Sequence, residues 1–179
     1  DVADDGSYRS STSNQKEAAV VASVVAELLE RRLEDGASSR SLTTDDILVV
    51  CPYNAHVRAV EAALVERGIR RVRVGTVDRF QGREAPVVVA SLCAPPSQND
   101  EDEDSVASGG RGVAFVLDVR RLNVALSRAQ CLAVLVAAPD LADGAASSLD
   151  RMRELAVLSR LRELAVDTVV AEESVAGEP

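Results

Sequence analysis

Lysine, aromatic residues and long apolar runs are scarce in this 179-residue chain. It contains one lysine, no tryptophan, two tyrosines and two phenylalanines. No uninterrupted apolar run approaches the roughly 18 residues of a membrane span, which excludes a transmembrane protein and a membrane partner. The first residues are acidic and lack the basic and apolar regions of a secretory signal, so we expect a cytoplasmic chain. The single lysine, Lys16, follows Gln15, so the chain has no Gly-Lys-Ser/Thr phosphate-binding loop.

Cysteine and histidine are too few and too scattered to indicate a metal site or a catalytic triad. Cys51, Cys93 and Cys131 lie far apart, without the spacing of zinc ligands, and each stands in or beside an apolar run. We therefore predict three buried, reduced thiols and no metal. His56 stands near a predicted helix start, where we interpret it as solvent-facing or capping.

The net charge of −9 is unevenly distributed. Acidic residues gather at both ends of the chain and at residues 100–104, whereas the segment 67–84 carries six arginines against two acids. A net acidic protein can thus present a local cationic surface that attracts phosphates. A solvated face with scattered ion pairs is the alternative, and composition alone does not decide between them.

Helical and strand patterns alternate along one domain, residues 1–170, followed by a frayed acidic tail, residues 171–179. The first helix is predicted from Asn14, as N-cap, to Asp35, with Glu17 completing a capping box and Gly36 as the stop. A long acidic, mobile surface loop is expected at 94–112. The remaining predicted elements are strands at 47–51, 72–76, 86–92 and 132–136 and helices at 55–66, 121–129 and 149–170.

This alternation predicts an α/β fold with a mainly parallel sheet covered by helices on both faces. Ligands of such sheets collect at the carboxyl ends of the strands. Three polar segments are candidates for that edge: residues 52–54, residues 76–84, and Ser127-Arg128 after a helix.

Two of these segments carry a resemblance to a known family. Residues 76–84, Thr-Val-Asp-Arg-Phe-Gln-Gly-Arg-Glu, and residues 121–129, Arg-Leu-Asn-Val-Ala-Leu-Ser-Arg-Ala, resemble motifs V and VI of superfamily 1 helicases. The branch is that of the nonsense-mediated-decay RNA helicase and of bacterial DNA helicases fused to RecB-type nucleases. Residues 50–55 are similar to motif IV, and residues 13–18 resemble the start of the second motor domain. The resemblance implies the second RecA-like domain, a three-layer fold of the P-loop NTPase type.

In that family, ATP with Mg²⁺ binds between two RecA-like domains, and the N-terminal one supplies the Walker A loop. The resemblance therefore implies an ATP-dependent DNA helicase as part of a longer chain, with this part inactive alone. It implies that Arg128 is the arginine finger; the alternative is a surface salt bridge. Gln81, Gly82 and Glu84 would contact the nucleotide, or form a plain polar turn. Arg121 would organise the phosphate side, or pair with Asp118, and Gln15 replaces an arginine of many relatives near the γ-phosphate.

The resemblance also implies a groove for single-stranded nucleic acid, with DNA favoured over RNA. Thr76 would touch the backbone phosphates without reading sequence. Pro52, Tyr53 and Asn54 would line the same groove, and Arg79 is assigned to it; Tyr53 has the alternative of simple packing. The leading hypothesis is therefore a helicase motor half. A non-enzymatic α/β module that binds protein or nucleic acid, without a motor partner, remains the alternative.

Overall fold

The core of the fold is a four-stranded parallel sheet in the order β4-β3-β5-β6. The computed structural model describes residues 13–36, 38–93, 118–138 and 149–166. The strands are β3 (Ile47–Cys51), β4 (Arg73–Thr76), β5 (Ala85–Ser91) and β6 (Ala129–Val136). All three strand pairings are parallel, as the sequence predicted.

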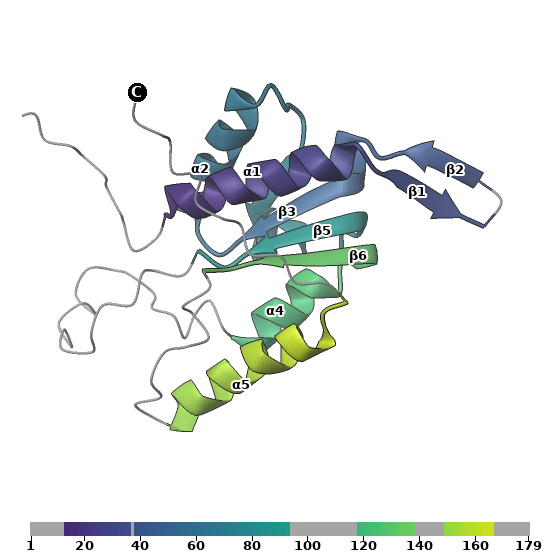
Figure 1. Cartoon of the computed structure of the whole chain (residues 1–179). Helices are drawn as coiled ribbons and strands as arrows, with labels where there is room; N and C mark the ends of the chain where they lie inside the picture. Colours follow the sequence, from purple (N-terminus) through teal and green to yellow (C-terminus); the bar gives the residue numbers. More distant parts are fainter. Residues whose placement is uncertain (1–12, 37, 94–117, 139–148, 167–179) are drawn as a thin grey trace, which may run out of the picture.

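Helices cover both faces of this sheet (Figure 1). On one face lie α1 (Gln15–Leu29) and α2 (Asn54–Glu66), and on the other lies α4 (Val119–Leu126), with α5 (Leu149–Leu164) beside it. A 3-10 turn, η1 (Thr44–Asp46), precedes β3, and a second one, η2 (Val77–Phe80), follows β4. The three-layer α/β fold is confirmed.

The sheet is held by apolar side chains that alternate between its faces. Every residue of β3 is buried. Ile47, Val49 and Cys51 belong to the apolar cluster under α1 and α2, whereas Leu48 and Val50 belong to the cluster that includes Ala125 of α4. Successive side chains of a strand point to opposite faces, so a continuous apolar run fits a strand that is covered twice.

The predicted extent of the first helix is wrong. Asn14 does cap α1, but the helix ends at Leu29, and residues 32–35 instead form β1 (Arg32–Asp35) of an antiparallel hairpin with β2 (Ser38–Ser41). Gly36, with φ of +55°, lies at the hairpin turn rather than at a helix stop. An ion pair anchors this hairpin to η1. Both terminal nitrogens of Arg40 in β2 contact the carboxylate of Asp46, at 2.6 and 2.7 Å.

The last helix, predicted to residue 170, ends at Leu164. The remaining elements fall within three residues of their predicted bounds, and the differences matter at two places. α4 ends at Leu126, so Arg128 follows the helix instead of lying on it. β6 is an edge strand whose first half is exposed, so the prediction of a buried Cys131 is wrong, although Cys51 and Cys93 are buried. The predicted loop 94–112 and tail 171–179 lie outside the described residues. In the described part of the chain, no helix is long and apolar enough to cross a membrane.

Candidate nucleotide and nucleic-acid sites

The predicted site residues fall at two opposite ends of the parallel sheet. Cys51 and Thr76 are paired at the carboxyl ends of β3 and β4, so residues 52–54 meet Thr76 there. Glu84 and Arg128 instead lie at the amino ends of β5 and β6, where Ala85 N–H donates to the Arg128 carbonyl at 3.1 Å. Seven residues of β5 separate the two ends by about 20 Å.

The prediction that all three polar segments gather at the carboxyl ends is therefore wrong for Glu84 and Arg128. The reason is the short connection after β4. The turn η2 folds back against β4, and Gln81 to Glu84 then lead to the amino end of β5. A segment that follows one strand thus also precedes the next strand, and only the fold shows which end its last residues reach.

At the amino end, Arg128 is half-buried and directly follows Ser127, the C-cap of α4. Its Nε is buried and has no hydrogen-bond acceptor in the described part of the chain. A buried donor without an acceptor costs free energy, typically about 1 to 3 kcal/mol. No ion pair of Arg128 is found among the described residues, so they provide no support for the salt-bridge alternative.

The turn before β5 is open to solvent beside Arg128. Gly82 has φ of +78°, a conformation that favours glycine, and no atom lies within 4 Å of where a Cβ would stand. Gln81 and Glu84 are exposed, and the Gln130 amide on β6 donates to the Glu84 carboxylate at 3.4 Å. The Glu84 carboxylate, the Gln81 amide and the Gly82 backbone thus lie with Arg128 at one accessible edge of the sheet.

At the carboxyl end, Asn54 is exposed and Pro52 and Thr76 are half-buried. Tyr53 is only 8% exposed and belongs to an apolar cluster with Leu92 and Leu122. Its ring is therefore packed, as the sequence alternative proposed, and does not offer a stacking face.

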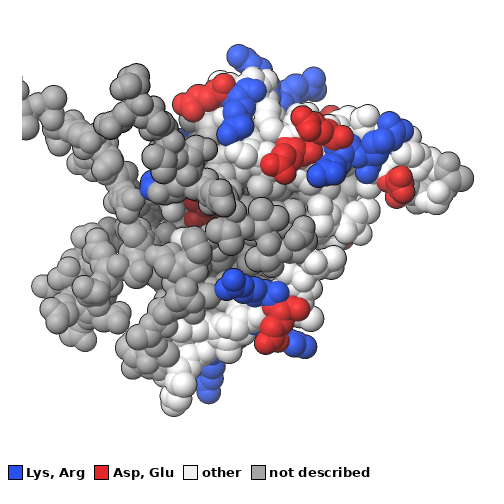
Figure 2. Space-filling model, viewed as in Figure 1, with Lys and Arg blue, Asp and Glu red and all other residues white. Residues whose placement is uncertain are grey.

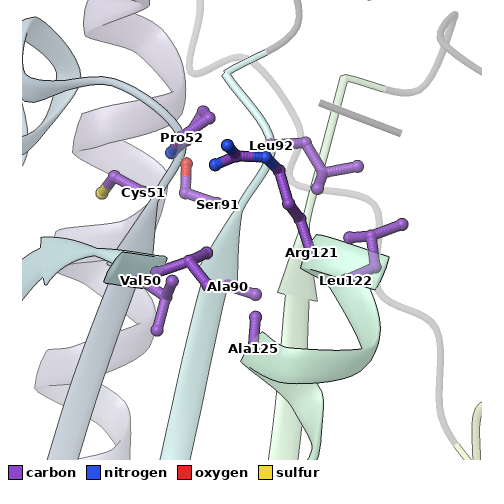
Figure 3. Close-up of a pocket in the computed structure, with 10 residues that line it drawn as sticks. Val50, Cys51, Pro52, Ala90, Ser91, Leu92, Arg121, Leu122 and Ala125 are labelled. Atoms are coloured by element: carbon purple, nitrogen blue, oxygen red, sulfur yellow. The ribbon is translucent and has the colours of Figure 1, made fainter. Parts of the chain in front are cut away.

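Arg121 also lies at the carboxyl end, not beside Arg128. Figure 3 shows its side chain extending from α4 across the end of β5 toward Pro52, over a hollow of about 30 Å³. That volume holds little more than one water molecule. Arg121 lies in the first turn of α4, whereas Arg128 follows the C-cap at the other end of that helix. Gln15 begins α1 at the same carboxyl end, because the neighbouring Asn14 N–H donates to His56 Nδ1 at 3.4 Å.

The sequence reasoning missed a buried polar network at this end of the sheet. His56 is fully buried, so its interpretation as solvent-facing is wrong. Its Nε2 lies 2.7 Å from Ser91 Oγ, which donates to Glu17 Oε1 at 2.5 Å, and Cys93 N–H donates to the same oxygen. Glu17 therefore does not serve the predicted capping box; it joins α1 to the end of β5. Two signals were available in the sequence: a serine inside an apolar strand, and a glutamate on the apolar face of a helix.

Burial shifts the pKa values of this network. It lowers the pKa of His56 to about 4, and it raises the pKa of Glu17, against the opposing effect of hydrogen bonds from Ser91 and Cys93. Within the described ranges, no cluster of three or more histidine, cysteine or acidic side chains could hold a metal ion.

The surface over α1 and the hairpin is not a cationic face. Figure 2 shows basic side chains beside acidic ones there, so this side of the molecule is mixed in charge. The cationic surface was predicted for segment 67–84, not for these elements. Arg79 lies elsewhere, at the outer edge of β4, where its Nη1 donates to the Val74 carbonyl at 3.2 Å.

A parallel sheet covered on both faces, with motif V and VI segments at its ends, defines a RecA-like α/β domain. A family model described as "AAA domain" matches residues 2–140, and the chain belongs to that family, within the superfamily 1 helicases. It is 39% identical over 121 residues to "DNA polymerase alpha-associated DNA helicase A" of Schizosaccharomyces pombe, covering 68% of this chain and 15% of that protein.

Two further relatives show the range of the family. The chain is 33% identical over 113 residues to "DNA replication ATP-dependent helicase/nuclease DNA2" of Mus musculus, covering 63% of this chain and 9% of the relative. It is 28% identical over 101 residues to "RNA helicase Mov10l1" of Mus musculus, covering 56% of this chain and 8% of the relative. The chain thus spans a small part of relatives that are named as DNA and as RNA helicases.

Proposed function

We propose that residues 1–170 are the second RecA-like motor domain of an ATP-dependent superfamily 1 helicase. Arg128 supplies the arginine finger, and the carboxyl-end surface forms part of the groove for a single nucleic-acid strand. The observation that carries the proposal is the buried Nε of Arg128, which has no acceptor within the described ranges and stands beside the open turn at Gly82.

A guanidinium suits this role because it is permanently charged and presents a fork of donors that matches phosphate oxygens. When bound, ATP with Mg²⁺ supplies the γ-phosphoryl group for transfer to water. Arg128 donates to the phosphate oxygens, and Glu84, with Gln81 and the Gly82 backbone, accepts and donates hydrogen bonds at the nucleotide. Gln15 and Arg121 stand at the other end of the sheet, so the proposal for the nucleotide does not depend on them.

The Walker A loop must come from another RecA-like domain, because no Gly-Lys-Ser/Thr sequence exists in this chain. The chain alone is therefore proposed to be inactive as an ATPase. At the opposite end, Pro52, Asn54 and Thr76 contact the backbone of the strand. DNA is favoured over RNA because the two relatives with the higher identities quoted above are named as DNA helicases.

The test uses the longest natural polypeptide that contains this chain and a Walker A domain. Arg128→Ala should lower ATP turnover by about 10³-fold to 10⁵-fold while leaving strand affinity within about twofold, because an arginine finger acts on the charge of phosphoryl transfer. Arg160→Ala, which removes an exposed arginine on α5, is the matched control.

Undiminished turnover in Arg128→Ala would refute the arginine finger. If the wild-type polypeptide has no ATPase activity but binds protein or nucleic acid, the non-enzymatic module is the correct interpretation.

A further inference from the structure

A second basic site lies at the free edge of the sheet, along β4 and next to the turn that carries Gly82 and Glu84. β4 is an edge strand, and along it lies an open hollow of about 300 Å³. The described residues that line it are Glu61, Val72, Arg73, Val74, Arg79, Phe80 and Arg83. Three guanidinium groups therefore surround the hollow, against one carboxylate.

These three arginines form no ion pair with a carboxylate in the described part of the chain. Arg73 Nη2 donates to the Asp45 carbonyl at 2.7 Å, and Arg79 donates to the Val74 carbonyl. Both acceptors are neutral peptide groups. Arg73 Nε is buried and has no acceptor among the described residues, and Arg83 is exposed. The hollow thus holds excess positive charge and donors without an anionic partner.

The backbone holds one of these arginines in place. A Cβ added to Gly75 would lie 2.7 Å from Arg79 Cδ and 2.9 Å from Phe80 Cε2. The absence of a side chain at residue 75 thus leaves room for Arg79 to lie close over β4. The Arg79 guanidinium then donates to the Val74 carbonyl along the strand edge, and an arginine already held there loses less entropy when a ligand binds.

We propose that this hollow, the β4-edge site of Arg73, Arg79 and Arg83, binds phosphate groups of the nucleic-acid strand where it leaves the carboxyl-end surface. Forked, permanently charged guanidinium groups are suited to phosphate oxygens. Arg73 is three residues from Thr76, about 10 Å along β4, so one strand can contact both. Phe80 is buried, so the site contacts the backbone rather than stacking bases. The inference rests on the proposed function.

The test measures the affinity of this chain for oligothymidylate at several salt concentrations. Each phosphate contact contributes about 0.7 to the slope of log affinity against log salt for a single strand. Arg73→Gln, Arg79→Gln and Arg83→Gln should each reduce that slope by about 0.7, and the triple variant by about 2. Arg160→Gln, on the helix layer across the sheet, has the same charge change and should leave the slope unaltered.

A second measurement follows the arginine Nε resonances by NMR during titration with oligothymidylate and, separately, with inorganic phosphate. Shifts of Arg73, Arg79 and Arg83 with the oligonucleotide support the site. Shifts with inorganic phosphate alone would overturn it in favour of a site for free phosphate. Unchanged slopes in all three variants, while Thr76→Ala weakens binding, would overturn this inference and leave the proposed function standing. No salt-dependent binding by the unaltered chain would count against both.

Discussion

Ser91 connects the carboxyl end of β5 to the two helices that pack on that face of the sheet. Its hydroxyl donates to Glu17 of α1 and lies 2.7 Å from His56 Nε2 of α2, so one side chain of β5 connects both helices of that face. Because His56 Nδ1 accepts from the Asn14 N–H, the proton of the neutral ring is on Nε2, which donates to Ser91. Protonating His56 would break the contact with Asn14 and charge a buried ring.

The pH dependence of stability follows from this network. The pKa of His56 is lowered to about 4, below the ordinary value of 6.5, so the unfolded state binds more protons between those values. The stability contribution is complete above about pH 6.5 and is lost as the pH falls toward about 4, by on the order of 3 kcal/mol. His56→Gln should flatten this loss in urea unfolding measured across that range.

Glu17→Gln is the matched variant, because the pKa of Glu17 is shifted in the direction that gives the opposite pH dependence of stability. Burial raises the pKa of Glu17, so its contribution to stability is present at low pH and is lost as the pH rises through the raised value. Removing that contribution should make the acid-induced loss of stability steeper than in the wild type. Identical pH profiles for the wild type and both variants would contradict the linkage.

At the scale of elements, α1 shows what local sequence does and does not determine. Its start is local: Asn14 Oδ1 accepts from the Glu17 N–H at 3.1 Å, and the Asn-x-x-Glu spacing predicted a cap. Its end is not local. The charged residues after Leu29 could continue a helix, but pairing with residues 38–41 and the contact of Arg40 with Asp46 give a hairpin instead.

The cap of α1 can be measured. Asn14→Ala should lower the free energy of unfolding by about 1 kcal/mol, because the Glu17 N–H at the helix start loses its acceptor. Asn14→Ser, which retains a capping oxygen, should cost a few tenths of a kcal/mol at most. Urea or thermal unfolding of the three proteins at one pH is the measurement, and equal losses in both variants would show that the cap oxygen contributes nothing.

At the scale of the whole molecule, the sheet separates two kinds of chemistry. Thr76 lies at the carboxyl ends of the strands, and Glu84 and Arg128 lie at the amino ends, about 20 Å away. Under the proposed function, strand contact and nucleotide contact are made by opposite ends of one rigid layer, so a movement of the layer alters both together.

This separation predicts that a single substitution in the longer polypeptide with a Walker A domain changes either strand binding or ATP binding, but not both. Thr76→Ala should weaken single-strand binding several-fold, through the loss of a backbone contact, and leave the KM for ATP measured without a strand unchanged. Glu84→Gln should do the reverse, raising the KM for ATP several-fold and leaving strand affinity intact. Steady-state kinetics and fluorescence titration measure the two effects, and a common loss in both variants would contradict the division.

The sequence by itself determined the family and most of the elements, though not the hairpin after α1. Continuous apolar runs at 47–51 and 86–92 predicted strands covered on both faces, and the ordered motifs around Gln81 and Arg128 indicated a RecA-like helicase domain, because both signals are local in the chain.

Only the tertiary structure decided which residues share a site. It placed Arg128 with Glu84, moved Arg121 and Gln15 to the opposite end, buried His56, and gathered Arg73, Arg79 and Arg83 along β4. The physical reason is that strand register, crossover geometry and the burial of polar groups depend on contacts between residues far apart in the chain. A pattern read along one segment contains no information on those partners.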